Sequence, residues 1–176
     1  MKPPADLDSL FFPTFVRSGR AILRATGPGT LRGLPEAGTF AGPLQAEITH
    51  NHIHFDWAEG RNPRERWRNN LALAKAARLA WKSVLDSAFA GVTFRLLIMS
   101  QARGMDIADG TGFSSADPTL YLFQAALDVG GIFEECISPN PGAIELVYSG
   151  ESFGQWVRAD DFFTKSGQIR KRPPFR

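Results

Sequence analysis

Residues 61–91 carry the sequence RNPRERWRNNLALAKAARLAWKSVLDSAFAG, and this stretch decides the fold of the chain. Asn62 is a good N-cap residue, Pro63 suits the first helical position, and Glu65 is placed to complete a capping box. The alanines and leucines that follow favour a helix as far as about Ala90, and Gly91 is a typical residue at which a helix stops. The stretch therefore predicts one long helix.

The predicted helix has two different faces. With about 100° of rotation per residue, large and small apolar side chains gather on one side. These residues are Leu73, Ala77, Ala80, Trp81 and Val84. Basic side chains gather within about 40° of another common direction. These residues are Arg64, Arg68, Lys75, Arg78 and Lys82, called the basic stripe below.

Residues 44–57, just before this helix, alternate apolar and polar side chains, but the phase changes in the middle. The apolar positions are Leu44, Ala46, Ile48, Ile53, Phe55 and Trp57. One continuous strand could not bury both the even and the odd positions. A hairpin with His50-Asn51 as its turn pairs Ile48 with Ile53 and makes one face wholly apolar. We therefore expect a hairpin here.

Further β elements are predicted on both sides of the helix. Residues 20–25 read as a short strand and residues 92–100 as a central, nearly all-apolar strand. Asp117-Pro118 is typical of a helix start, although residues 119–123 could also be a strand. Three later segments predict an antiparallel meander: residues 132–137, 143–148 and 155–158. The predicted class is α+β, with one long amphipathic helix packed on a mixed or mainly antiparallel sheet with two hairpins.

Length and composition favour a single domain over residues 1–176. A chain of 176 residues with 43% hydrophobic content can bury one sizeable core. Residues 1–17 predict an extended N-terminal arm, and residues 165–176 predict a basic C-terminal tail. The sequence has no signal-peptide pattern and no apolar run of about 18 residues. With a single cysteine, Cys136, which fits a reducing compartment, we expect a cytoplasmic protein.

The net charge of +2 hides an uneven distribution of charged residues. Residues 61–82 contain seven basic side chains and one acid, Glu65, and residues 165–176 contain five basic side chains and no acid. Charged helix faces usually interleave acids with bases at i,i+4 spacing. Like charges gathered on one face repel one another and therefore favour a partner of opposite sign.

The basic stripe and the basic tail predict a nucleic-acid-binding module for DNA or RNA, such as one serving a prokaryotic defence or mobile-element system. Lysine and arginine in a row can neutralise successive phosphates, and Trp67, at the border of the stripe, could stack on a base. The alternative is an assembly subunit that docks on protein partners, or on copies of itself, through the same surfaces. The residues expected to bind nucleic acid are Arg64, Trp67, Arg68, Lys75, Arg78, Lys82, Arg170, Lys171 and Arg172.

The three histidines raise a second alternative, a metal-dependent enzyme. In the predicted hairpin His52 and His54 share one face, and Glu47 lies across from His54, so that the three could meet one divalent ion. Three ligands without an evident closed site are more typical of a polar sheet face. We therefore expect neither a bound metal nor another cofactor.

Other polar clusters lack a catalytic motif. Asp106, Asp109 and Asp117 surround a glycine-containing loop, which is ordinary turn chemistry. Residues 110–112 lack the lysine of a P-loop, and the acids beside Cys136 oppose formation of a thiolate. The sequence therefore favours a binding protein over an enzyme.

Overall fold

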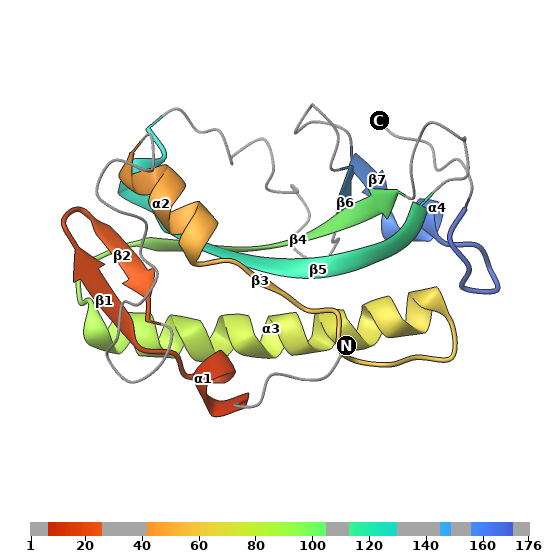
Figure 1. The fold of residues 1–176 in the computed structure, drawn as a ribbon, viewed down its shortest axis with the longest axis horizontal. Helices are drawn as coiled ribbons and strands as arrows, with labels where there is room; N and C mark the ends of the chain where they lie inside the picture. The colour runs from red at the N-terminus through yellow and green to blue at the C-terminus, as the bar shows by residue number, and fades with distance from the viewer. Residues whose placement is uncertain (1–6, 26–41, 105–112, 130–144, 149–155, 171–176) are drawn as a thin grey trace.

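A computed structural model describes residues 7–25, 42–104, 113–129, 145–148 and 156–170 (Figure 1). The chain has one long helix, with shorter helices and strands before and after it in the sequence. In chain order the elements are α1 Leu7–Phe11, β1 Phe15–Ser18, β2 Ala21–Arg24, α2 Pro43–His50, β3 Ile53–His54, α3 Pro63–Ala88, β4 Phe94–Gly104, β5 Phe113–Gln124, the 3-10 helix Ala125–Leu127, β6 Glu145–Tyr148, β7 Trp156–Arg158 and α4 Ala159–Phe162. The fold is α+β, as predicted.

The long helix α3 begins where the sequence predicts. The Asn62 side chain accepts a hydrogen bond from the Glu65 backbone N–H at 2.9 Å, and Pro63 occupies the first turn. The Glu65 carboxylate does not complete the capping box, because it accepts the Arg61 backbone N–H at 2.8 Å instead. The helix ends at Ala88, two residues before the predicted end, and Gly91 follows with a φ of 83°.

Five strands form a mixed sheet in the order β3-β5-β4-β6-β7, and β1 and β2 form a separate hairpin. β4 and β5 pair antiparallel at the centre, which confirms the predicted central strand. β6 joins β4 in parallel, whereas β3 and β7 pair antiparallel with their neighbours. The antiparallel pairing predicted for the last two segments of the meander is confirmed by β6 and β7, and the parallel pairing of β6 with β4 was not predicted. Residues 132–137 lie outside the described residues.

Asp117-Pro118 lies inside β5 and does not start a helix. A proline is tolerated there because the missing N–H would face β3, which ends at His54, and the Pro118 carbonyl still accepts the Phe55 N–H at 2.8 Å. The strand interpretation of residues 119–123 is confirmed. β4 also continues to Gly104, four residues beyond the predicted end of the central strand.

One face of the sheet packs on α3, which runs along it in Figure 1. The centre of this core is Trp81, which is fully buried and packs edge-on against Phe15 of β1. Its indole N–H donates to the Leu10 carbonyl at 2.8 Å and so fastens α1 to α3. The other buried residues of this core include Ile22, Ile53, Phe55, Ala74, Ala77, Leu85, Leu120 and Leu122.

The predicted hairpin at residues 44–57 is wrong in its first half, because residues 43–50 form the helix α2. Pro43 occupies its first turn, a position that suits a helix start. Ile53 pairs with Leu120 of β5 and not with Ile48. Ile48 packs instead against Met99 and Tyr121, on the sheet face opposite α3.

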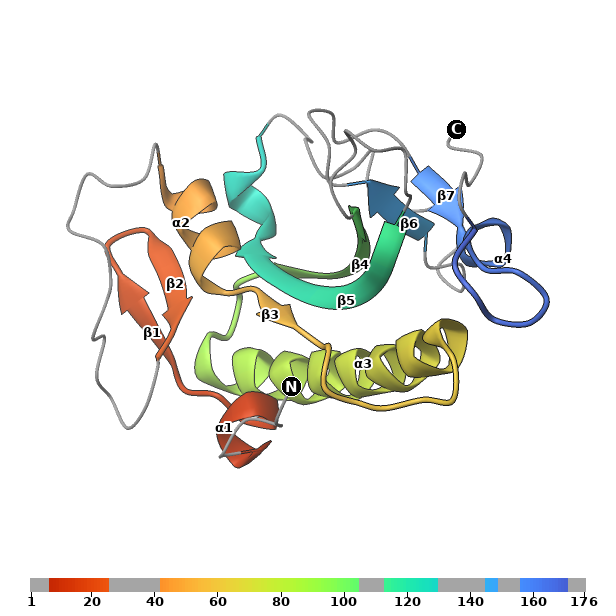
Figure 2. The same cartoon turned by 45° about the vertical axis from the view of Figure 1, so that its right-hand side comes forward.

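Two buried polar side chains explain why residues 43–50 form a helix and not the predicted strand. Glu47 is fully buried, and its carboxylate accepts hydrogen bonds from the Ile22 N–H at 2.7 Å and the Gln124 N–H at 2.7 Å. Asn51, one turn later, accepts the Arg24 N–H at 2.8 Å and donates to the Ile22 carbonyl at 2.7 Å. A helix places both side chains on one face. α2 thereby joins β2 to β5, and Figure 2 shows it between them.

Burial and hydrogen bonding act on the Glu47 carboxyl in opposite directions. Burial raises its pKa above the usual range, while the N–H donors of Ile22 and Gln124 and the charge of Arg17 favour the ionised form. The Gln124 side-chain amide adds a further donor at 2.5 Å. All these hydrogen-bond donors belong to Ile22 of β2 and Gln124 of β5. The carboxylate therefore connects α2 to both strands.

We predict that Glu47→Gln lowers the free energy of unfolding by about 1–3 kcal/mol, although glutamine has nearly the same shape. The glutamine amide would turn one acceptor into a donor and face a backbone N–H of Ile22 or Gln124. Chemical denaturation measures the loss. Thr49→Ala, on the exposed side of the same helix, is the control and should change stability by less than about 0.5 kcal/mol. Equal stability of Glu47→Gln and the parent protein would contradict the proposed role of the carboxylate.

Candidate functional site

The C-terminal segment docks on the first turns of α3. Phe163 is buried, and its ring lies 5.6 Å from that of Trp67. The following turn closes with a hydrogen bond from the Thr164 N–H to the Gln168 carbonyl at 2.7 Å. The carbonyl of Gly167 then accepts the Arg64 N–H at 3.0 Å. The start of α3 and the C-terminal turn, which are far apart in the sequence, are therefore in direct contact.

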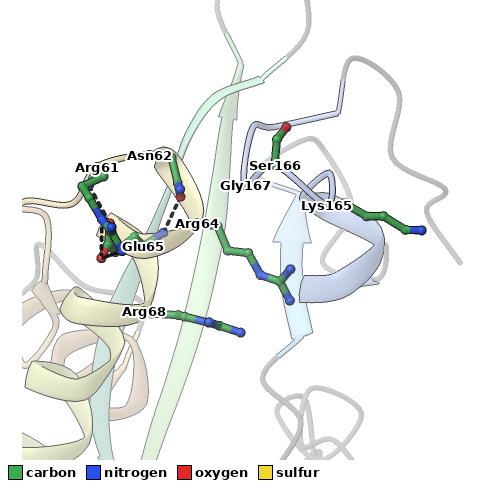
Figure 3. Close-up of a pocket in the computed structure, with 8 residues that line it drawn as sticks. All are labelled: Arg61, Asn62, Arg64, Glu65, Arg68, Lys165, Ser166 and Gly167. Atoms are coloured by element: carbon green, nitrogen blue, oxygen red, sulfur yellow. Dashed lines mark hydrogen bonds and ion pairs between the residues drawn. The ribbon is translucent and has the colours of Figure 1, made fainter.

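A cavity of about 240 Å³ lies between the turn at residues 164–168 and the start of α3 (Figure 3). In Figure 3, Arg64, Arg68 and Lys165 extend toward the same side, whereas Arg61 folds back onto Glu65. The residues that line the cavity, called the cationic pocket below, are Arg61, Asn62, Arg64, Glu65, Arg68, Lys165, Ser166 and Gly167.

Two of the four cations in the pocket have carboxylate partners. Arg61 makes an ion pair with Glu65 at 2.9 Å, and its hydrogen bonds lower the pKa of the Glu65 carboxyl. Arg64 makes an ion pair with the exposed Asp160, while its Nε is buried without a hydrogen-bond partner among the described residues. Arg68 and Lys165 form no ion pair with any residue that the structure describes. Positive charge therefore remains at the mouth of the pocket.

Backbone N–H groups at the start of α3 are already occupied. Pro63 has none, and those of Arg64 and Glu65 donate to the Gly167 carbonyl and the Asn62 side chain. The Arg66 N–H donates to the Asn62 carbonyl at 3.0 Å. An anion in the pocket would therefore be bound by side chains and not by the helix terminus.

The remaining stripe residues continue from the pocket along α3. Lys75 is exposed and Arg78 is partly exposed, and neither has an acidic partner in the described part of the chain. Lys82 is paired with Asp86 on the next turn at 2.5 Å. Between the pocket and Lys82, three cations of the stripe thus remain uncompensated by described residues: Arg68, Lys75 and Arg78.

The structure corrects the expected role of Trp67. Its side chain is only 7% exposed, and its indole N–H donates to the Ser100 hydroxyl at 2.9 Å. The ring belongs to the packed side of α3 because Phe163 covers it, so it is not available to stack on a base. Arg170 is exposed, whereas Lys171 and Arg172 lie outside the described residues.

The three proposed metal ligands do not converge. Glu47 is buried among the donors of β2 and β5, because residues 43–50 are helical and not a strand opposite His54. His54 Nδ1 lies 2.9 Å from the Thr119 hydroxyl, and His52 stacks on Tyr121. No group of three or more histidine, cysteine, aspartate or glutamate side chains within the described residues could hold a metal ion.

Of the three aspartates predicted to surround a loop, the structure describes only Asp117, and this residue makes an ion pair. Asp117 lies 3.6 Å from the Arg66 guanidinium and is almost fully buried. Asp106, Asp109 and Cys136 lie outside the described residues.

The described helices include none that is both long and apolar enough to cross a membrane.

Sequence reasoning missed the contribution of Arg61, Lys165 and Ser166 to the pocket. Arg61 directly precedes the N-cap, so its position beside the helix start was readable from the sequence. Lys165 was counted only as the first residue of a basic tail. Its place next to Arg68 depends on the docking of Phe163, which no local pattern reveals.

Comparison of the sequence with protein-family models and with curated proteins, and of the fold with solved structures, gives no match.

We predict that Gly167→Ala destabilises the protein more than Gly19→Ala does. Both glycines have positive φ, at 83° and 57°, so both substitutions carry a backbone cost of about 1–2 kcal/mol. A Cβ at residue 167 would also lie 2.4 Å from the Asn62 side chain, whereas one at residue 19 meets nothing within 4 Å. Chemical denaturation of both variants separates the two effects. Equal losses would mean that the turn does not rest on the start of α3.

Proposed function

We propose that this protein binds nucleic acid by contacting backbone phosphates through α3 and the adjacent C-terminal turn. The observation that carries the proposal is a row of cations without acidic partners among the described residues, running from Lys165 and Arg68 to Lys75 and Arg78. Each such cation can displace a condensed counterion from a phosphate, which favours binding.

The arrangement of partners favours an external ligand over internal neutralisation. If the acidic remainder of the chain served to neutralise the stripe, its carboxylates would be expected to approach all five cations. Among described residues only Arg64 and Lys82, at the two ends, have such partners. From Arg64 to Lys82 the stripe covers roughly 27 Å at about 1.5 Å per residue, a length over which several phosphates of one strand can be met.

Contacts of this kind carry little base specificity. Phosphates look alike in every sequence, and base readout needs side chains that reach base edges or stack on them. Trp67, the aromatic residue expected to supply stacking, is buried. The proposed activity is therefore binding with a strong dependence on salt and a weak dependence on sequence.

We predict that Arg68→Gln/Lys75→Gln/Arg78→Gln weakens binding to duplex DNA and flattens the slope of log K against log salt concentration. Three lost contacts should change the slope by about 2.7, since each contact contributes about 0.9 on B-form DNA. Fluorescence anisotropy across a salt series measures both quantities. Glutamine is a good helix former, so the variant should melt like the parent protein.

A matched control removes one cation away from the stripe. Arg20 is exposed in the turn between β1 and β2, so Arg20→Gln should leave the salt slope unchanged, while Arg68→Gln alone should lower it by about 0.9. Equal effects of the two single variants would reduce the proposal to general attraction by net charge. A parent protein that binds neither DNA nor RNA at low salt would instead assign the stripe to a protein interface.

A further inference from the structure

The cationic pocket differs from the rest of the stripe in shape and in charge. Lys75 and Arg78 are not among the residues that line the pocket, whereas Arg68 of α3 and Lys165 of the C-terminal turn both line it and extend toward the same side (Figure 3). Its lining residues comprise four cations and one carboxylate, Glu65. A pocket with this excess of positive charge favours an anion with more than one negative charge.

The size of the pocket limits what it can hold. A volume of about 240 Å³ is below the roughly 300–1,000 Å³ of sites that enclose drug-sized ligands. The pocket thus suits one phosphate group with bound water, and the remainder of the ligand would lie outside it.

The pocket also lies at the end of the stripe. The turn at residues 164–168 rests on the first turn of α3, where the Gly167 carbonyl accepts the Arg64 N–H. A Cβ at residue 167 would clash with Asn62, so turn and helix are in close contact there. A strand that follows the stripe from Lys82 toward Arg64 therefore meets protein backbone beyond the pocket.

From these three features we infer that the cationic pocket binds the terminal phosphate of a nucleic-acid strand whose internal phosphates lie along the stripe. A terminal phosphate carries a charge of about −1.5 to −2 at pH 7, while each internal phosphodiester carries one negative charge. Arg68 and Lys165 supply the direct contacts. Arg61 and Arg64, which are paired with Glu65 and Asp160, line the pocket beside them. The inference rests on the proposed binding of nucleic acid.

The test compares one labelled oligonucleotide with a 5′-phosphate, with a 3′-phosphate and with hydroxyl ends. The full chain should bind one of the phosphorylated forms about tenfold more tightly than the hydroxyl form, as expected for one additional charge-assisted contact. Arg68→Gln/Lys165→Gln should abolish that preference. Lys75→Gln/Arg78→Gln, which removes the same charge outside the pocket, should weaken all forms equally and keep the preference.

The possible failures are distinguishable. Binding of all forms with equal affinity, or a preference that survives Arg68→Gln/Lys165→Gln, overturns the terminal-phosphate site and leaves the proposed function standing. Absence of binding to every form overturns both. Inorganic phosphate and a phosphoserine peptide are titrated at constant ionic strength as further arms. If either binds in a manner that depends on Lys165 while the oligonucleotides show no end preference, the pocket serves that ligand, and the inference is wrong.

Discussion

The buried carboxylate of Glu47 is the interaction on which the arrangement of this molecule depends. It accepts hydrogen bonds from the backbone of Ile22 in β2 and from the backbone and side chain of Gln124 at the end of β5. The two strands belong to different sheets, so no ladder of backbone hydrogen bonds joins them. Burying a carboxylate costs several kcal/mol, and here the cost is offset only if all the donors stay in position. The carboxylate thus imposes one relative placement of the two sheets.

In this arrangement the N-terminal and C-terminal segments of the chain pack on different parts of α3. The β1–β2 hairpin and α1 pack on its second half, where Trp81 contacts Phe15 and donates to Leu10. The C-terminal segment covers its first turns, where Trp67 contacts Phe163 (Figure 1). The two tryptophans point their indole N–H groups at different partners, α1 and β4. One helix therefore carries the core contacts of both ends on one face and leaves the opposite flank exposed with its basic residues.

Local signals in the sequence were sufficient to predict α3 and the central strand, and insufficient for α2. The cap formed by Asn62 and Pro63 involves neighbouring residues, so the sequence displays it directly. Residues 44–50 display alternation as well, but their conformation is decided by Glu47 and Asn51, whose partners lie 25 to 77 residues away. The burial of Trp67 likewise depends on Phe163. The angular position of Trp67 around the helix shows which residues lie on the same side. It does not show that Phe163 covers that side.

The ion pairs around α3 determine where its positive charge is available. Pairs as exposed as Lys82–Asp86 contribute little to stability, typically less than about 1 kcal/mol, so their effect is mainly on the surface potential. Arg61 and Lys82 are compensated within one helical turn by Glu65 and Asp86, and Arg64 by Asp160. Within the described part of the chain, the stripe residues without an acidic partner are Arg68, Lys75 and Arg78, and Lys165 lines the cationic pocket together with the first of them. The stripe residues that these pairs leave uncompensated among the described residues follow one side of α3, and this arrangement is the basis of the proposed binding of a linear polyanion.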